Sequence, residues 1–462
     1  MTEASTGWTR RGFVGTTAAV GAAATLGITV PARAAKAQAT DRLPAFPGAE
    51  GFGAAASGGR GKAVYEVTNL DDAGPGSLRD ALSQGDRTVV FRVSGTINLK
   101  SQLRLSKPNI TIAGQTAPGD GICLRGRELF IADTDNVIVR FLRLRPGDEL
   151  KAEHDALSIR NCRNVIVDHC SLSWSTDSLN DVTHTSGNVT VQWCILAEPL
   201  NNSVHVKGAH GYATGWDGRV IDDGKGGKTG GGGSYHHNLI AHAASRAPRI
   251  GYYKQGRGLI DCRNNVIYNC GSSYGGETDD FNYVGNYYRL GPSGMNKDGA
   301  IFDVWADDSR MYVAGNVVEG FAEPSTDNAK GVRFKKGDAA KVLVERPFDV
   351  APVKNDSAEE AFARVLKQGG AILPKRDAAD VRIVTDVENR TGKLINSQAD
   401  VGGWPELKSA EAPADADHDG MSDEWERKHG LNPNDAADGA KAKEAGGYTN
   451  LEVYLNELAA AP

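Results

Sequence analysis

The sequence lacks three features that would place it in other broad classes of protein. After the N-terminal segment, no apolar run in the 462 residues approaches the roughly 20 residues that a membrane-spanning helix needs. An excess of basic residues is also missing, because 52 lysines and arginines face 58 acidic residues. Nucleic acid is therefore not expected as the main partner, since neutralising phosphates takes clustered Lys and Arg. The six cysteines are too few for a disulfide scaffold in a chain of this length.

The net charge of −6 is unevenly distributed along the chain. Residues 411–462 carry 12 acidic and 4 basic residues, whereas residues 35–410 carry no net charge. A neutral body joined to an acidic tail predicts that the tail holds cations. We therefore divide the chain into a leader (1–34), a body (35–410) and an acidic tail (411–462).

The leader has the pattern of an export signal. The pair Arg10-Arg11 precedes a mildly apolar stretch that runs to Val30, and an Ala-x-Ala site for a signal peptidase follows at 32–34. We interpret this pattern as a twin-arginine signal, with an ordinary secretory signal as the alternative. The mature protein is then expected to be secreted to the medium or the periplasm.

Short segments rich in β-branched and aromatic residues repeat through the middle of the chain. They include VRFLRLRPG, VDHCSLSWS, VQWCILAEP and YHHNLIAHA. A period of 20–30 residues indicates a solenoid, and these segments have strand composition without the pattern of leucine-rich repeats. The sequence therefore predicts an all-β solenoid of the parallel β-helix type. The aligned positions are Leu142, Cys170, Cys194, Asn238, Asn265, Asn286 and Asn316.

Stacked turns of such a coil lie about 4.8 Å apart, so like residues at one position meet. The four asparagines are predicted to form a hydrogen-bonded ladder. Cys170 and Cys194 are predicted to stack as buried thiols, and a disulfide between neighbouring turns stays open.

Two segments are expected to form helices that cap or flank the coil. Residues 74–82 form a short amphipathic pattern with Ser77 as N-cap. Ser357 and Glu360 form a capping box that opens a second helix, and Gly369 follows its end. This helix and the segment after it are expected to pack on the outside of the coil or on its end.

Four carboxylates occupy positions about one turn apart. Glu153 and Asp155 precede one strand, and Asp177 and Asp181 follow the next. The step from Asp155 to Asp177 is 22 residues, which places the two pairs side by side on one face. Converging carboxylates repel one another unless a hard cation binds, so the spacing predicts a Ca²⁺ site.

Three basic residues follow at the next turns, Lys207, Arg246 and Arg249. A site with an acidic, metal-binding end and a basic end suits a polyanion that carries carboxylates. The metal would bridge one substrate carboxylate while the basic side chains hold others.

Three segments, VTNLDDAGPGSLRDAL, NVIVDHCSLSW and YHHNLIAHAASRAPRIG, resemble the pectate lyases of polysaccharide lyase family 1. The resemblance covers roughly 45–405. It implies a right-handed parallel β-helix that cleaves polygalacturonate, the acidic backbone of pectin, by Ca²⁺-dependent β-elimination to unsaturated oligogalacturonides. A monomer is expected.

Matched motif by motif, the resemblance also implies roles for individual residues. Glu153, Asp155, Asp177 and Asp181 would be calcium ligands, and Asp168-His169 matches a structural pair. The sequence departs from the family at Gly251, where a further arginine is common. Arg246 would be the base that takes the C5 proton. Arg249 would be an assisting cation, and Lys207 would contact a substrate carboxylate.

The base is the chemical difficulty in this interpretation. The C5 proton is weakly acidic because it lies next to a carboxylate, and cations on that carboxylate stabilise the enolate-like transition state. Arginine has a reference pKa above about 12 and is almost always protonated. A metal-bound hydroxide is therefore the competing base.

The tail contains the pattern D-x-D-x-D-G-x5-E of a calcium loop. A structural Ca²⁺ clip is expected here, with Asp435 and Asp438 as remnants of a degraded second loop. The segment is similar to dockerin-like and thrombospondin-type calcium repeats. The predicted ligands are Asp415, Asp417, Asp419, Asp423 and Glu426.

Two other functions remain open from the sequence. A β-helical glycoside hydrolase acting on the same substrate would need two carboxyl groups about 6.5–9.5 Å apart and no Ca²⁺. A non-catalytic polysaccharide-binding β-helix would not need Arg246 beside the metal ligands.

Overall fold

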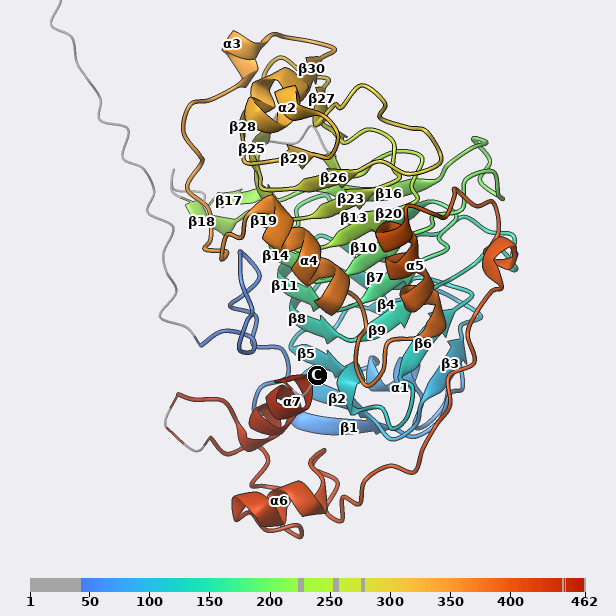
Figure 1. Ribbon diagram of the computed structural model, residues 1–462. Helices are drawn as coiled ribbons and strands as arrows, with labels where there is room; N and C mark the ends of the chain where they lie inside the picture. Colours follow the sequence, from blue (N-terminus) through green and yellow to red (C-terminus); the bar gives the residue numbers. More distant parts are fainter. Residues whose placement is uncertain are drawn as a thin grey trace, which may run out of the picture. The chain divides into compact units, whose positions relative to one another are not determined.

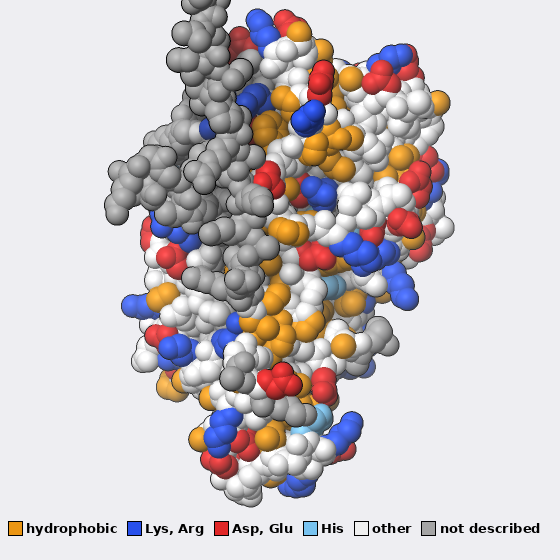
Figure 2. All heavy atoms as spheres, turned by 90° about the vertical axis from the view of Figure 1, so that its left-hand side faces the viewer, with side chains coloured by type: hydrophobic (Ala, Val, Ile, Leu, Met, Phe, Trp, Pro, Cys, Tyr) orange, Lys and Arg blue, Asp and Glu red, His pale blue; other side chains and the backbone are white. Residues whose placement is uncertain are grey.

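The computed structural model describes residues 43–222, 228–251, 257–275, 279–442, 444 and 446–460. The predicted export signal (1–34) lies outside these residues. The described chain belongs to one compact unit, and none of its helices is long and apolar enough to cross a membrane. On the face shown in Figure 2, acidic and basic side chains of the described residues are interspersed.

Three parallel sheets wind into a solenoid, which confirms the predicted parallel β-helix (Figure 1). Sheet A contains β1 (Ala63–Val67), β2 (Arg87–Phe91), β5 (Ile110–Ala113), β8 (Asp135–Arg140), β11 (Arg163–Asp168), β14 (Gly187–Gln192), β19 (Gly233–His236), β22 (Gly258–Arg263), β25 (Asp279–Val284) and β28 (Arg310–Ala314). Sheet B contains β3 (Gly95–Asn98), β6 (Ile122–Arg125), β9 (Leu142–Leu144), β12 (Ser171–Ser173), β15 (Ile195–Ala197), β20 (Leu239–Ala241), β23 (Val266–Tyr268), β26 (Tyr287–Arg289) and β29 (Val317–Val318). Sheet C contains β4 (Leu103–Leu105), β7 (Leu129–Ala132), β10 (Leu157–Arg160), β13 (Ser178–Thr183), β16 (Tyr212–Trp216), β21 (Arg249–Ile250), β24 (Tyr274–Gly275), β27 (Phe302–Val304) and β30 (Val332–Phe334). A hairpin of β17 (Val220–Asp222) and β18 (Lys228–Gly231) projects from the coil.

The chain turns from sheet A to sheet B through a single residue in the left-handed conformation. His169, for example, has φ +50° and separates β11 from β12, and Asn264 has φ +54° before β23. Only a few residue types adopt this conformation readily, chiefly Gly and Asn. Further residues at this corner are Phe141, Trp193, His237, Gly285 and Gly315.

Apolar side chains fill the coil and stack from one turn to the next. Leu157 pairs with Leu129 and Ile159 with Ile131 on neighbouring strands of sheet C, and all four are buried. This shared core holds the turns in register and thereby sets the positions of the polar side chains outside.

The predicted asparagine ladder is confirmed. The Nδ2 atom of Asn238 donates to Oδ1 of Asn265 at 3.0 Å, Asn265 donates to Asn286 at 3.0 Å, and Asn286 donates to Asn316 at 2.9 Å. Asn328 extends the ladder by one more hydrogen bond. The side-chain amides satisfy backbone groups that the sharp corner leaves without sheet partners.

The cysteines are buried free thiols, which settles the alternative that the sequence left open. Cys170 and Cys194 stack as predicted, with the backbone N–H of Cys170 3.4 Å from the Sγ atom of Cys194. The position that carries asparagine in later turns thus carries small apolar side chains in these earlier ones.

Helices cover parts of the solenoid. Ser77 caps α1 (Leu78–Ala81), and Ser357 and Glu360 form the predicted capping box of α4 (Ala358–Gln368). Helices α4 and α5 (Ala378–Asn389) pack against the outer face of sheet B through one apolar cluster. The other helical segments are η1 (Gly114–Thr116), α2 (Ala322–Thr326), η2 (Asn328–Gly331), α3 (Ala339–Val342), η3 (Gln398–Val401), α6 (Asp423–His429) and α7 (Asn450–Ala460).

Candidate active site

The outward face of sheet C brings two sequence-predicted residues, Asp181 and Arg249, into one row. The strand register pairs Ser158 with Asp181, Asp181 with Gly215, and Gly215 with Arg249. Asp181 and Arg249 are thus separated by two strand spacings, or about 10 Å. Gly215, which lies between them, contributes no side chain to the row. An acidic position and a basic position therefore face outward from the same sheet.

Three of the four carboxylates predicted as calcium ligands act on one another electrostatically. Loss of hydration, followed by repulsion from Asp181, Asp177 and Glu128, raises the pKa of Asp155 well above its usual range. Burial also raises the pKa of Asp181 to about 6, with Asp177 adding to the shift and Arg246 opposing it.

Glu128, which sequence reasoning missed, joins this group from the preceding turn. The Ser158 hydroxyl lies 2.6 Å from Oδ2 of Asp155 and 2.8 Å from Oε2 of Glu128. A hydroxyl has one proton to donate, so it cannot satisfy both ionised carboxylates at once. Burial and the charge of Asp177 raise the pKa of Glu128.

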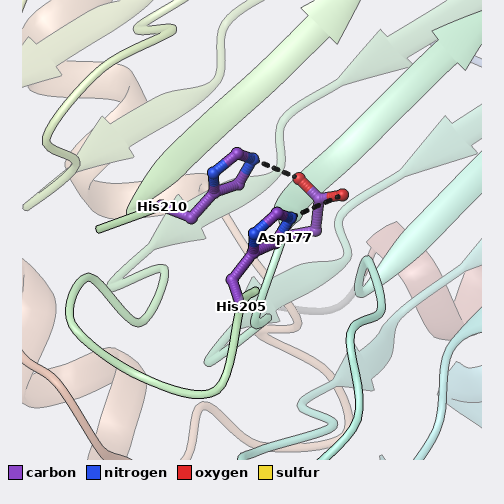
Figure 3. A group of neighbouring side chains, drawn as sticks. All are labelled: Asp177, His205 and His210. Carbon is purple, nitrogen blue, oxygen red and sulfur yellow. Dashed lines mark ion pairs between the residues drawn. The ribbon is translucent and has the colours of Figure 1, made fainter. Parts of the chain in front are cut away.

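Asp177 lies against two stacked imidazoles from the loop 201–211 (Figure 3). Its carboxylate oxygens are 3.0 Å from Nε2 of His210 and 3.8 Å from Nε2 of His205. The two rings are nearly parallel, with centroids 3.5 Å apart. These histidines lie beside Lys207 in the sequence, but neither has a motif that marks it as part of the site.

Glu153 is turned toward the same loop. Its Oε1 atom accepts a hydrogen bond of 2.6 Å from the backbone N–H of Val206 and lies 3.7 Å from Nδ1 of His205. The structure thus places Glu153 at the edge of the carboxylate group, where it anchors the loop that carries Lys207.

Arg246 is buried beside the carboxylates. Its Nη1 atom donates to the Ser178 hydroxyl at 3.0 Å and lies 3.9 Å from Oδ2 of Asp181. The guanidinium carbon is 4.4 Å from the centre of the Tyr212 ring, a distance typical of a cation–π contact. Arg246 has φ +55°, a conformation that the surrounding strands hold in place.

The two other predicted basic residues are more exposed than Arg246. Arg249 is partly exposed, and its guanidinium carbon lies 6.0 Å from the centre of the Tyr274 ring. Lys207 is exposed on the loop 201–211. Burial lowers the pKa of His210. The charge of Asp177 opposes this shift, and His205, Arg246 and Lys207 add to it.

The carboxylates of Asp155, Asp177, Asp181 and Glu128, which we call the carboxylate group, have the chemistry of a site for a hard cation. The Oδ1 atom of Asp181 is buried and has no hydrogen-bond partner among the described residues. An anionic oxygen in that position is costly unless a cation compensates it. Oxygen ligands drawn from Asp155, Asp177 and Asp181, with Glu128 adjacent, suit Ca²⁺.

Comparison with known proteins identifies the family. A model of the pectate lyase family matches residues 16–284. Probable pectate lyase C of Aspergillus oryzae is 35% identical over 428 residues, which cover 91% of this chain and 95% of that protein. The chain belongs to the pectate lyase family. This pectate lyase is therefore an enzyme of the polysaccharide lyase class, and it is also 36% identical over 432 residues to probable pectate lyase C of Emericella nidulans, covering 91% and 94% of the two chains.

Solved structures agree with the fold of this pectate lyase. A variant pectate lyase of Bacillus subtilis has a TM-score of 0.51 at 15% identity and covers 71% of this chain and 98% of its own. The cedar-pollen allergen Jun a 1 has a TM-score of 0.50 at 20% identity and covers 70% and 92%. At these identities the likeness concerns the β-helix alone.

The pair Asp168-His169 lies away from the carboxylates. Nδ1 of His169 is 2.9 Å from Oδ1 of Asp168, and Arg140 pairs with the other oxygen of Asp168 at 2.8 Å. The His169 ring stacks between Phe141 and Trp193 at the corner of sheets A and B. These contacts agree with a structural role.

In the tail of the pectate lyase, most of the predicted calcium loop comes together. Asp415, Asp417 and Asp419 have oxygens within 4.8 Å of one another, and Glu426 approaches Asp419 equally closely. Asp423 differs from the expectation. Its Oδ1 atom accepts from the backbone N–H of Ala416, and its Oδ2 atom pairs with Arg427, so neither oxygen faces the cluster.

Proposed function

We propose that this pectate lyase cleaves α-1,4-linked polygalacturonate by β-elimination and releases unsaturated oligogalacturonides. The observation that carries the proposal is the place of Arg246, whose guanidinium lies within 3.9 Å of Asp181 in the carboxylate group. A base beside a cation site is the arrangement that this elimination needs.

Ca²⁺ held by Asp155, Asp177 and Asp181 would polarise the uronate carboxylate and stabilise the charge that develops on it. Glu128 and Glu153 support the group, the first through Ser158 and the second through the loop 201–211. In this proposal, the oxygens of Asp155, Asp177 and Asp181 bind the cation, and those of Glu128 and Glu153 support these ligands.

The basic side chains bind and orient the substrate. Lys207 is exposed and Arg249 is partly exposed, and both would pair with uronate carboxylates of the substrate. This pairing fixes the C5 hydrogen of one sugar relative to Arg246.

Arg246, as the neutral guanidine, takes the C5 proton in this proposal and becomes the guanidinium. The C5–H electron pair forms the C4–C5 double bond, and the bond from C4 to the glycosidic oxygen breaks with its electrons leaving on oxygen. Ser178 and Tyr212 hold the guanidinium against the sheet, so one edge is fixed by protein contacts. A proton returned to the leaving oxygen completes the reaction.

One assay tests the reaction and separates it from the alternatives. Polygalacturonate is incubated with the protein with added Ca²⁺ and, in parallel, with a chelator. We expect Ca²⁺-dependent ultraviolet absorbance from the unsaturated uronide. New reducing ends without that absorbance would support a hydrolase instead, and the absence of both would support a binding protein. Pectins of graded methyl esterification then define the substrate preference.

Secretion through a twin-arginine signal is part of the same proposal. Replacing Arg10 and Arg11 together by lysine should retain the protein in the cytoplasm, because that pair is the mark of the route. Unchanged export of the double variant would favour an ordinary secretory signal.

A further inference from the structure

The acidic tail contains a second group of converging carboxylates, far from sheet C in the sequence and built by different elements. We call Asp415, Asp417, Asp419, Glu426 and Asp438 the tail cluster. Oxygens of the first three lie within 4.8 Å of one another, and so do oxygens of Asp419, Glu426 and Asp438.

Three aspartates of the tail cluster share one arrangement. Asp415, Asp419 and Asp438 each accept a backbone N–H with one oxygen, from Gly420 at 3.1 Å, Met421 at 2.9 Å and Asn432 at 3.1 Å, respectively. The other oxygen of each has no hydrogen-bond partner in the described part of the chain. The backbone thus fixes each carboxylate and leaves one oxygen for a ligand.

The unpartnered oxygens are deeply buried. Glu426 is fully buried, and Asp415, Asp419 and Asp438 are 3–6% exposed. Both oxygens of Glu426 and both of Asp417 also lack hydrogen-bond partners among the described residues. Burial, with repulsion from neighbouring carboxylates, raises the pKa of Asp419 and of Glu426 to about 7. These seven oxygens without partners fall within the range of six to eight oxygen ligands that Ca²⁺ takes.

The tail cluster lies near the first turns of the solenoid, where α7 lies beside β1 and β2 (Figure 1). Met421, Leu451 and Leu455 pack with Val64 of β1 and Ala113 of β5 in one apolar group. A side chain at Gly420, which has φ +89°, would come within 3.1 Å of Val64. The calcium loop thus packs against the outer face of sheet A.

Polar contacts join the same two parts. Nδ1 of His418, in the loop, is 2.8 Å from Oε2 of Glu66, and Arg92 lies 3.3 Å from Glu66 and 3.8 Å from Asp415. Arg60 pairs with Glu452 of α7 at 2.7 Å. The fold of the loop and its attachment to the solenoid therefore depend on shared residues.

We propose that one Ca²⁺ bound by the tail cluster closes the tail into a clip over the first turns of the β-helix. The ligand set includes Asp438 and excludes Asp423, in contrast to the pattern along the sequence. Without the ion, repulsion among the carboxylates opens the loop and releases α6 and α7 from sheet A. This site is independent of the cation site on sheet C.

Terbium binding tests the ligand set in the full chain. Tb³⁺ takes the place of Ca²⁺ and emits when an excited tryptophan is near, and Trp425 directly precedes Glu426. The protein carries Asp181→Asn to weaken the sheet C site. We expect emission that Ca²⁺ competes away and that Trp425→Phe largely removes. Asp438→Asn and Glu426→Gln should weaken binding at least about tenfold through loss of ligand charge, and Asp423→Asn less than about threefold. Equal affinity of Asp438→Asn and the parent, or a larger loss in Asp423→Asn than in Asp438→Asn, would overturn the assignment.

Trypsin cleavage after Arg427 or Lys428 in α6 tests the clip. In the same Asp181→Asn background, cleavage should be at least about ten times slower in Ca²⁺ than in chelator, because a closed loop rarely opens. Asp438→Asn should remove most of that difference while the circular dichroism of the solenoid stays unchanged. Equal cleavage rates with and without Ca²⁺ would refute the clip, whatever the protein does to polygalacturonate.

Discussion

Nη1 of Arg246 lies 3.9 Å from Oδ2 of Asp181, so the proposed base and a proposed calcium ligand attract each other. Each group therefore influences the other's charge state. A cation on Asp181 would take up part of that carboxylate's charge and weaken its hold on the guanidinium, which favours proton loss from arginine. Metal binding and activation of the base are then linked through one contact.

Arg246→Lys should lower kcat at neutral pH by about 10²- to 10⁴-fold, the range typical of a lost general base. Lysine keeps the positive charge but has no second nitrogen to reach the substrate while the first holds Ser178. Initial rates of uronide formation, with circular dichroism as a check on folding, measure the effect. Arg249→Lys is the matched control and should change KM more than kcat. Near-wild-type turnover in Arg246→Lys would remove Arg246 from the mechanism and favour a metal-bound hydroxide.

Protons should compete with Ca²⁺ at the sheet C site. Because the pKa of Asp181 is raised to about 6, this carboxyl becomes protonated as the pH falls through that value, and the apparent Ca²⁺ affinity should then fall by up to about tenfold per pH unit. Calcium titrations of activity at pH 5, 6 and 7 measure the slope. In Asp181→Asn the affinity should be weaker throughout and the slope shallower. A pH-independent affinity in the wild type would contradict the assignment of Asp181 as a ligand.

Removing the metal should reveal that Asp181 destabilises the fold when ionised. The pKa of this carboxyl in the folded state is above its ordinary value of 3.8. The folded state therefore loses stability as the pH rises from 3.8 toward about 6. In chelator at pH 7.5, Asp181→Asn should therefore unfold with a free energy about 1–3 kcal/mol higher than the wild type, and this gain should vanish near pH 4. Denaturant titrations measure the difference. Excess Ca²⁺ should reverse its sign, and a variant less stable than the wild type in chelator at pH 7.5 would refute the argument.

Features that repeat with the turns of the coil were predictable from the sequence. The asparagine ladder was predictable because its members recur at one position of each repeat, and the corner after sheet A fixes their direction. Asp155, Asp177 and Asp181 were associated because about one turn separates them. The strand register, which pairs Ser158 with Asp181, is one residue longer than the step of 22 from Asp155 to Asp177.

The residues that the sequence did not reveal depend on contacts without a repeating pattern. Glu128 reaches the site because Ser158 bridges it to Asp155, which no spacing along the chain indicates. His205 and His210 meet Asp177 only through the path of the loop 201–211. In the tail, the linear pattern counts positions but does not show that Asp423 caps the backbone at Ala416 and pairs with Arg427 instead of facing the cluster.

His210 should act as a positioning residue for Asp177. Its Nε2 atom is 3.0 Å from that carboxylate, and burial keeps its pKa low, so a neutral ring orients the carboxylate by hydrogen bonding. His210→Ala should raise the Ca²⁺ concentration needed for half-maximal activity by about 10- to 100-fold, the range for lost supporting contacts at metal sites. The kcat at saturating Ca²⁺ should change little, and His210→Gln should restore part of the affinity. An unchanged Ca²⁺ requirement together with a lower kcat would assign His210 to the substrate instead.

Asn265→Ala should destabilise the solenoid without altering the chemistry. The Asn265 side chain accepts from Asn238 and donates both to the carbonyl of Tyr235, at 3.0 Å, and to Asn286. Its loss leaves buried polar groups on two turns without partners, at a cost of about 1–3 kcal/mol for each such group. We expect the free energy of unfolding to fall by at least about 2 kcal/mol in denaturant titrations, while kcat at a temperature well below the transition stays within about twofold of the wild type. The exposed Asn389→Ala, at the end of α5 and outside the ladder, is the matched control. A variant as stable as the wild type would show that the ladder contributes little to the stability of the coil. Water or a shifted backbone would then satisfy the same polar groups.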